Sequence, residues 1–305
     1  TIESDLGWST FKSITSRRDM EAQFGRDGDI AGVNFSSTFD KQDQDQTSQE
    51  FQFSGQNGNL SWIAGAFYFD ESYYDHNDVF QGPGMYQVLE TFPGQLAGTP
   101  CAPPWIAPGC KGNPINVALD IAIDVTNVVD VESTAFYSQL TYAVTDKLNL
   151  TAGVRTTDEE KTVFGNQYKE ASKTYILKAV TNVARWKETT SMFAIDYQVT
   201  EDLMAYVSFS EGFKSGGFNP RPVGGFTAAP FGPEYVESTE IGFKSELFDR
   251  RLRVNGAFYS SDYKDLQFSV NRFNEATGTL ELLVGNAAEA EIDGYELELE
   301  AVVTE

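Results

Sequence analysis

Residues 191–210 read SMFAIDYQVTEDLMAYVSFS, and this stretch decides the fold class. Its apolar side chains recur at every second position, first over 193–199 and again over 203–209. A period of two places alternate side chains on opposite faces of a β-strand. The polar residues 200–202 between the two runs are typical of a tight hairpin turn. The stretch therefore predicts two antiparallel strands joined by a short turn.

The same alternation recurs along the chain, for example over 148–154, 252–258 and 295–301. Each alternating segment continues for about ten to fifteen residues, which is the length that a tilted membrane-crossing strand requires. Strands of a soluble β-sandwich are usually shorter, at about five or six residues. The lengths therefore favour a transmembrane β-barrel.

Short and long connections alternate strictly along the chain. The short ones are residues 55–58, 145–148, 200–203 and 248–251, and the long ones fall near 20–46, 75–130, 158–187, 213–235 and 269–287. A transmembrane barrel has this asymmetry, with short periplasmic turns and long extracellular loops. The sequence predicts an all-β, antiparallel transmembrane β-barrel fragment of about ten strands, near 5–18, 47–56, 59–74, 131–145, 147–158, 186–199, 202–213, 235–248, 251–268 and 287–303.

Composition excludes several classes of function. The chain of 305 residues carries a net charge of −23, which argues against nucleic-acid binding because a phosphate-binding surface is basic. No apolar run is long enough for a transmembrane helix. With a single histidine and no phosphate loop or nucleophile motif, the sequence predicts no catalytic site, no cofactor and no metal site. It is therefore expected not to be an enzyme.

The two cysteines, Cys101 and Cys110, lie in a Pro- and Gly-rich stretch within the longest connection. This spacing favours a local disulfide in an oxidising compartment. The alternative is half of a metal site, but the sole histidine, His76, is distant in sequence and there is no third thiol.

Seven segments in one order resemble TonB-dependent outer-membrane receptors. Residues 203–219 resemble the family pattern Y-x-S-Y-S-x-G-F-K-x-G-G-F-N, and residues 235–249 resemble the next strand with its E-x-G-x-K pattern. Residues 11–17, 48–51, 62–71, 252–267 and 286–300 also match. Each motif is weak alone, but the order is specific, and the match covers nearly all of the chain outside the long loops.

The resemblance implies a barrel of about 22 strands closed around an N-terminal plug. Residues 1–305 would be a partial barrel domain without the plug and the C-terminal strands. The implied function is active transport of a ferric siderophore or similar scarce nutrient across the outer membrane of a Gram-negative bacterium. Energy would come from the TonB–ExbB–ExbD complex through the plug region. This segment would supply a wall in outer-membrane lipid and ligand-selecting loops.

Candidate ligand-binding residues lie in or beside the long connections. Aromatic side chains there can stack on a ligand or pack the loop onto itself, and both interpretations stay open. A binding element at the extracellular rim could include Glu211, Lys214 and the pair Gly216-Gly217, but such residues more often fix a strand-to-loop transition. The carboxylates of residues 40–45 lack the glycine and glutamate of a calcium loop, which favours a solvated loop. The candidates are Tyr73, Tyr74, Tyr86, Phe92, Trp105, Lys214, Phe218 and Arg221.

The polar set of the alternation is expected to line the inside of the barrel. It includes Arg155, Asp196, Glu240, Lys244, Asn255, Glu296 and Glu298. Two other classes of protein remain open. A passive porin or barrel adhesin shares the alternation, and only a plug with a TonB-contacting segment separates it from a receptor. A secreted β-sandwich or propeller hydrolase would be soluble without detergent.

Overall fold

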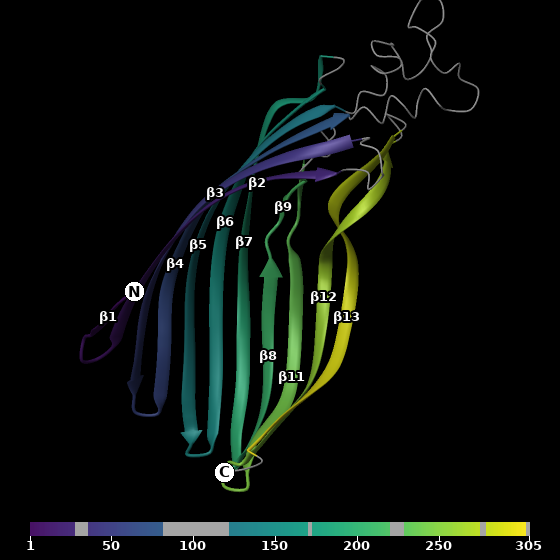
Figure 1. The fold of residues 1–305 in the computed structure, drawn as a ribbon. Coiled ribbons are helices and arrows are strands. Elements are labelled where there is room, and N and C mark those ends of the chain that lie inside the picture. The colour runs from purple at the N-terminus through teal and green to yellow at the C-terminus, as the bar shows by residue number, and fades with distance from the viewer. Residues whose placement is uncertain (28–35, 82–121, 170–172, 220–228, 275–278, 303–305) are drawn as a thin grey trace, which may run out of the picture.

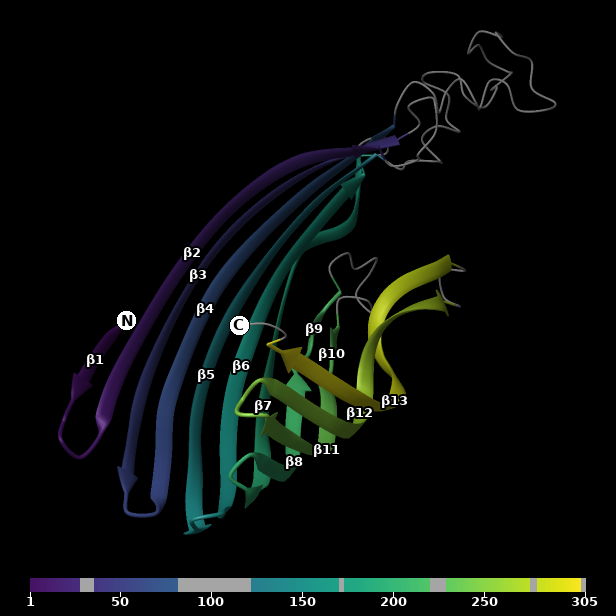
Figure 2. The same ribbon diagram turned by 60° about the horizontal axis from the view of Figure 1, so that its bottom comes forward.

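The part of the chain that the structure describes forms one large curved antiparallel sheet and one small hairpin. The computed structural model describes residues 1–27, 36–81, 122–169, 173–219, 229–274 and 279–302. Eleven strands pair in chain order, and β9 and β10 form a separate hairpin. Figures 1 and 2 show a curved wall with β1 and β13 at its two edges. The predicted antiparallel all-β barrel fragment is confirmed, and among the described residues no helix is long and apolar enough to cross a membrane.

The strands are long compared with the connections at one end of the wall. Their bounds are β1 Ile2–Asp5, β2 Thr10–Asp27, β3 Ser36–Asn57, β4 Leu60–Gln81, β5 Ile123–Thr145, β6 Leu148–Lys169, β7 Thr174–Thr200, β8 Leu203–Lys214, β9 Gly217–Phe218, β10 Pro230–Phe231, β11 Glu234–Leu247, β12 Leu252–Asn274 and β13 Thr279–Ala301.

All four predicted tight turns are present, and they lie together at the lower end of the wall in Figure 1, which we call the turn end. Side chains of the chain itself stabilise them. The Thr145 hydroxyl accepts hydrogen bonds from the backbone N–H groups of Lys147 and Leu148, at 3.2 and 3.1 Å. The Thr200 hydroxyl accepts one from Asp202 at 3.3 Å. The opposite end, from which the long connections run, is the mouth.

Two expectations about strand boundaries were wrong. The expected strand 5–18 is divided by a further turn, in which Gly7 has a φ of +84° and donates its N–H to the Asp5 carboxylate at 2.7 Å. Most other strands continue toward the mouth well past their expected ends, so that β4 reaches Gln81 and β7 begins at Thr174, whereas β8 and β11 lie within one residue of their expected bounds. Apolar alternation ends where both faces meet water, but backbone pairing continues there, and the alternation alone therefore underestimates strand length.

The two faces of the wall differ in chemistry. One cross-strand row runs through eight neighbouring strands and is entirely apolar or aromatic: Leu60, Tyr142, Leu150, Ile195, Val207, Ile241, Phe258 and Tyr295. Ile195, Ile241 and Tyr295 expose 45%, 59% and 86% of their surface. We call the belt of such residues the apolar band. On this face charged residues begin only beyond the band, toward the mouth, for example Asp70 and Glu132.

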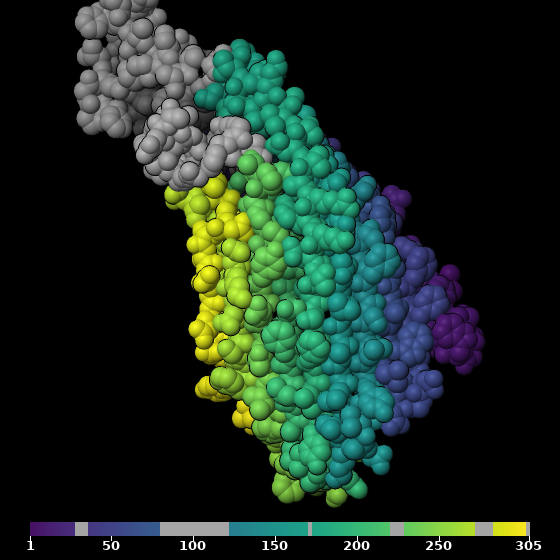
Figure 3. All heavy atoms as spheres, turned by 180° about the vertical axis from the view of Figure 1, so that it is seen from behind, coloured from purple at the N-terminus to yellow at the C-terminus, as the bar shows by residue number. Residues whose placement is uncertain are grey.

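The adjacent row points to the other face and is polar or small: Asn149, Asp196, Tyr206, Gly242, Ala257 and Glu296. Two tyrosines on this polar face donate their hydroxyls to carboxylates, Tyr137 to Glu50 at 2.6 Å and Tyr206 to Glu240 at 2.5 Å. The predicted inward set lies here. Seen from behind, the described strands form a continuous wall in chain order (Figure 3).

Candidate functional site

Two clusters of side chains lie on the polar face near the mouth, beyond the apolar band. The first joins β2, β3 and β4 and is the Asp40 network: Arg26, Thr38, Asp40, Gln42, Asp75 and Asn77. The second joins β6 and β7 to the segment around β9 and is the hairpin clamp: Lys161, Trp186, Gly216 and Phe218. Each brings together residues that are far apart in sequence.

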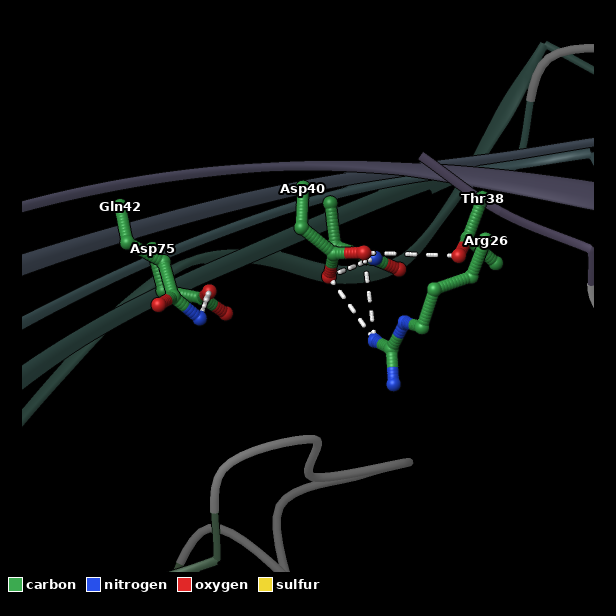
Figure 4. A network of polar contacts seen from close by, with 6 residues as sticks. Arg26, Thr38, Asp40, Gln42 and Asp75 are labelled. Atoms are coloured by element: carbon green, nitrogen blue, oxygen red, sulfur yellow. Dashed lines mark hydrogen bonds and ion pairs between the residues drawn. The ribbon is translucent and has the colours of Figure 1, made fainter. Parts of the chain in front are cut away.

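Asp40 is the centre of the first cluster, and only 2% of its surface is exposed. Nη2 of Arg26 donates to both carboxylate oxygens at 3.2 Å, and the Thr38 hydroxyl donates at 3.4 Å. The buried Asn77 amide donates to the same carboxylate (Figure 4 shows the network). The expectation that residues 40–45 form a solvated loop was wrong, because they belong to β3 and Asp40 is a buried acceptor shared by three strands.

We expect Asp40→Ala to destabilise the mouth ends of β3 and β4 by about 1–3 kcal/mol, because the fully buried Asn77 amide loses its acceptor. Arg26 adds little, since 58% of its side chain is exposed. Hydrogen exchange measured over residues 36–45 and 73–81 should become faster. The matched control, Asp43→Ala, removes an exposed ion pair with Lys41 on the other face and should change exchange little. Equal exchange in the two variants would contradict a structural role for Asp40.

The second cluster depends on the β9–β10 hairpin, which lies on the concave side of the wall (Figure 2). On one side Nζ of Lys161 donates to the Gly216 carbonyl at 2.8 Å, and the Trp186 and Phe218 rings meet edge to face at 6.4 Å. On the other side Asn219 exchanges hydrogen bonds with the backbone of Val284 in β13. The hairpin segment is therefore tied to β6 and β7 at one side and to β13 at the other.

The clamp offers an aromatic surface beside a cation. Nζ of Lys161 lies 5.7 Å from the centre of the Trp186 ring and 3.1 Å from a Glu159 oxygen. Trp186 and Phe218 are only partly buried. Partly exposed indole and phenyl rings can stack on planar groups, and a neighbouring ammonium attracts anionic ones. This arrangement suits a planar or anionic small ligand.

The structure separates the predicted ligand-binding residues. Tyr73 and Tyr74 are neighbours in β4 and so point to opposite faces. Tyr73 lies on the polar face, where burial raises its pKa and the carboxylates of Asp75 and Asp40 add to the shift. Tyr74 stacks on His76 on the other face. Lys214 is exposed at the end of β8, and Phe218 lies in the clamp. The remaining predictions lie outside the described residues: Tyr86, Phe92, Trp105, Arg221 and the pair Cys101 and Cys110.

Lys161, Trp186 and Arg26 were not among the predicted site residues. Trp186 could have been noticed in the sequence, because it lies in β7 on the face of Ala184, Glu188 and Thr190, where the nearest side chains are small or polar. An isolated aromatic in the polar register indicates a contact on that face. Nothing in the sequence marks Arg26 or Lys161 as a site residue, since charged residues are common in strands that meet water.

A shallow basin of about 910 Å³ lies on the polar face at the turn end. Two of its lining residues are basic, Lys244 and Arg253. Six are acidic: Glu201, Asp202, Glu240, Glu246, Glu296 and Glu298. Arg253 pairs with Glu300 at 2.8 Å and with Glu246 at 3.4 Å. The basin is therefore acidic with internal ion pairs.

Comparison with known proteins places these features in a family. A family model described as "TonB dependent receptor-like, beta-barrel" matches residues 2–302. Pesticin receptors of Yersinia enterocolitica and Yersinia pestis are 27% identical over 179 residues, which is 57% of this chain and 24% of theirs. The chain thus spans about a quarter of the length of these curated relatives.

Solved structures share the fold. The ferric yersiniabactin uptake receptor FyuA from Yersinia pestis superimposes with a TM-score of 0.72 at 18% identity, over 99% of this chain and 39% of that one. The siderophore receptor PiuA from Acinetobacter baumannii gives 0.67 at 17%, over 99% and 43%. The copper transporter OprC gives 0.62 at 10%, over 97% and 41%.

Proposed function

The chain belongs to the family of TonB-dependent receptor-like β-barrels, and from this we propose that it is a wall segment of an energised outer-membrane receptor rather than an enzyme. The observation that carries the proposal is the match to the barrel model over residues 2–302. The division of the wall into an apolar band and a polar concave face supports it, because a wide barrel needs a lipid-facing exterior and a wetted interior. Residues 1–305 would be part of one barrel domain.

The proposal assigns a location to each face and each end of the wall. The apolar band contacts outer-membrane lipid, the turn end lies in the periplasm and the mouth lies outside the cell. A plug from elsewhere in the protein fills the lumen against the polar face, with the acidic basin at its periplasmic side. The TonB–ExbB–ExbD complex drives transport through that plug.

We propose a ferric siderophore as the cargo. The titles of two solved structures support this class, since they name a ferric yersiniabactin uptake receptor and a siderophore receptor. The hairpin clamp supports it independently, because Trp186, Phe218 and Lys161 lie at the mouth where an aromatic or anionic chelate enters. A copper complex is the competing cargo, in view of the similarity to a copper transporter.

The test is uptake by cells that carry or lack the gene for the full-length protein. We expect deletion to abolish uptake of radioactive iron supplied as one siderophore from a panel, and removal of TonB to have the same effect. Uptake of iron that persists without TonB, together with open-channel conductance in planar bilayers, would instead identify a passive porin. Radioactive copper taken up in place of iron would replace the cargo assignment but keep the receptor.

A further inference from the structure

Four residues beyond the apolar band place one imidazole beside two carboxylates on the lipid-side face of β4 and β5. The strand register sets Asp78 directly opposite Asp124, and His76 directly opposite Thr126. Residues two apart in a strand share a face, so the four side chains form a compact square. We call this square the His76 patch. It lies outside the barrel lumen, on the far face of the wall from the hairpin clamp.

The distances in the patch are close to those of a metal site. Nε2 of His76 lies 3.3 Å from an Asp78 oxygen and 3.9 Å from an Asp124 oxygen. One ligand atom from each of the three residues lies within 4.8 Å of the others. Ligands of tetrahedral Zn²⁺, at about 2.0–2.2 Å from the ion, are about 3.3–3.6 Å apart. Small side-chain rotations would therefore complete the site.

The imidazole is held from two sides. Nδ1 of His76 lies 3.1 Å from the Thr126 hydroxyl, and the Tyr74 ring stacks on the imidazole at a centroid distance of 6.4 Å. In the tautomer that donates from Nδ1 to Thr126, Nε2 presents its lone pair toward the two carboxylates. Metal-binding histidines are oriented in this way by a partner on the other ring nitrogen.

The electrostatics of the patch favour a cation. Like charges directly opposite each other in an antiparallel pair are destabilising, as Asp78 and Asp124 are. On β3 the nearest cation, Lys41, lies opposite His76, and its ammonium lies 3.1 Å from the Asp43 carboxylate. On β6 the residues opposite Asp124 and Thr126 are the uncharged Tyr168 and Asn166.

We propose that the His76 patch binds a divalent transition-metal ion, with His76, Asp78 and Asp124 as ligands and water completing the coordination. A mixed imidazole and carboxylate set suits zinc and its neighbours in the first transition row better than calcium or magnesium. The ion links two strands outside the membrane and stiffens the mouth end of the β4–β5 pair. The site uses no residue of the hairpin clamp, so it is independent of the transported cargo.

Zinc binding to the full-length protein, extracted in detergent and stripped with a chelator, tests the proposal. Isothermal titration with Zn²⁺ alone should show that the wild type binds one equivalent of zinc. In His76→Gln and in Asp124→Asn this binding should be lost, or its affinity should fall at least tenfold. Thr126→Val should weaken binding by about tenfold, as expected for a residue that orients a ligand.

The matched control is Asp130→Asn, which removes a carboxylate from the same face of β5 and should leave zinc affinity unchanged. Heat-modifiable gel mobility verifies that every variant is a folded barrel. X-ray absorption at the zinc edge should show one imidazole nitrogen that disappears in His76→Gln. Zinc binding by His76→Gln with wild-type stoichiometry and affinity, or no binding by the wild type, would overturn the proposal.

Discussion

Ile195→Arg should lower the free energy of unfolding of the full-length barrel by about 2–4 kcal/mol, the cost of an arginine near the bilayer midplane. Ile195 is the centre of the apolar run in β7, and its row is apolar or aromatic through eight strands. It exposes 45% of its surface on the side away from the polar face. In lipid the guanidinium has no water and no partner, whereas in a soluble sheet an exposed arginine would be tolerated.

The control for this substitution is Asn149→Arg. Asn149 occupies the neighbouring row, on the polar face, where its register partner Asp196 can pair with an arginine. We expect a change within about 0.5 kcal/mol, as for most solvent-facing substitutions. Urea titration of the protein refolded into lipid vesicles, followed by tryptophan fluorescence, measures both. A loss of stability in Asn149→Arg as large as in Ile195→Arg would mean that the two faces have been assigned wrongly or that the wall does not lie in lipid.

The part of the wall that carries the apolar band could be predicted because one physical constraint controls it. One face is apolar and the other polar, so the two kinds of side chain alternate strictly, and the short turns mark the ends of the alternation. The register row through Ile195 can therefore be predicted from the sequence. The turn at Gly7 was missed because Leu6 and Trp8 keep the apolar pattern of a strand through it.

The mouth could not be predicted in the same way. There both faces of β3 to β7 carry polar residues, and a segment such as 40–45 has the same composition whether it forms a loop or a strand. Asp40 is buried only because Arg26 and Asn77 reach it from neighbouring strands, and the sequence distances between them are set by connections of arbitrary length. Only one half of the hairpin clamp was among the predicted site residues. Phe218 was a candidate, but its partner Trp186 is 32 residues away in the chain, and nothing in the sequence links the two.

Gly216→Ala should reduce the affinity of the receptor for its cargo at least tenfold, which corresponds to about 1.4 kcal/mol. A Cβ at Gly216 would lie 2.4 Å from the Phe231 carbonyl oxygen and 2.4 Å from a ring carbon of Trp186. A backbone oxygen cannot move without displacing β10, and such overpacking costs about 1–3 kcal/mol. The hairpin should therefore leave Trp186, and the hydrogen bond from Lys161 should be lost. This prediction rests on the clamp as a contact for the cargo.

Gly25→Ala is the matched control, because a Cβ there would lie 3.7 Å from the Thr38 carbonyl oxygen, in ordinary contact. Cargo titration followed by tryptophan fluorescence measures affinity, and hydrogen exchange over residues 215–219 reports separately whether the hairpin has moved. Since Gly216 lies beyond the end of β8 and outside the eleven-stranded sheet, barrel content should be normal in both variants. If exchange rises while affinity stays within twofold of the wild type, the hairpin is structural and the cargo binds elsewhere.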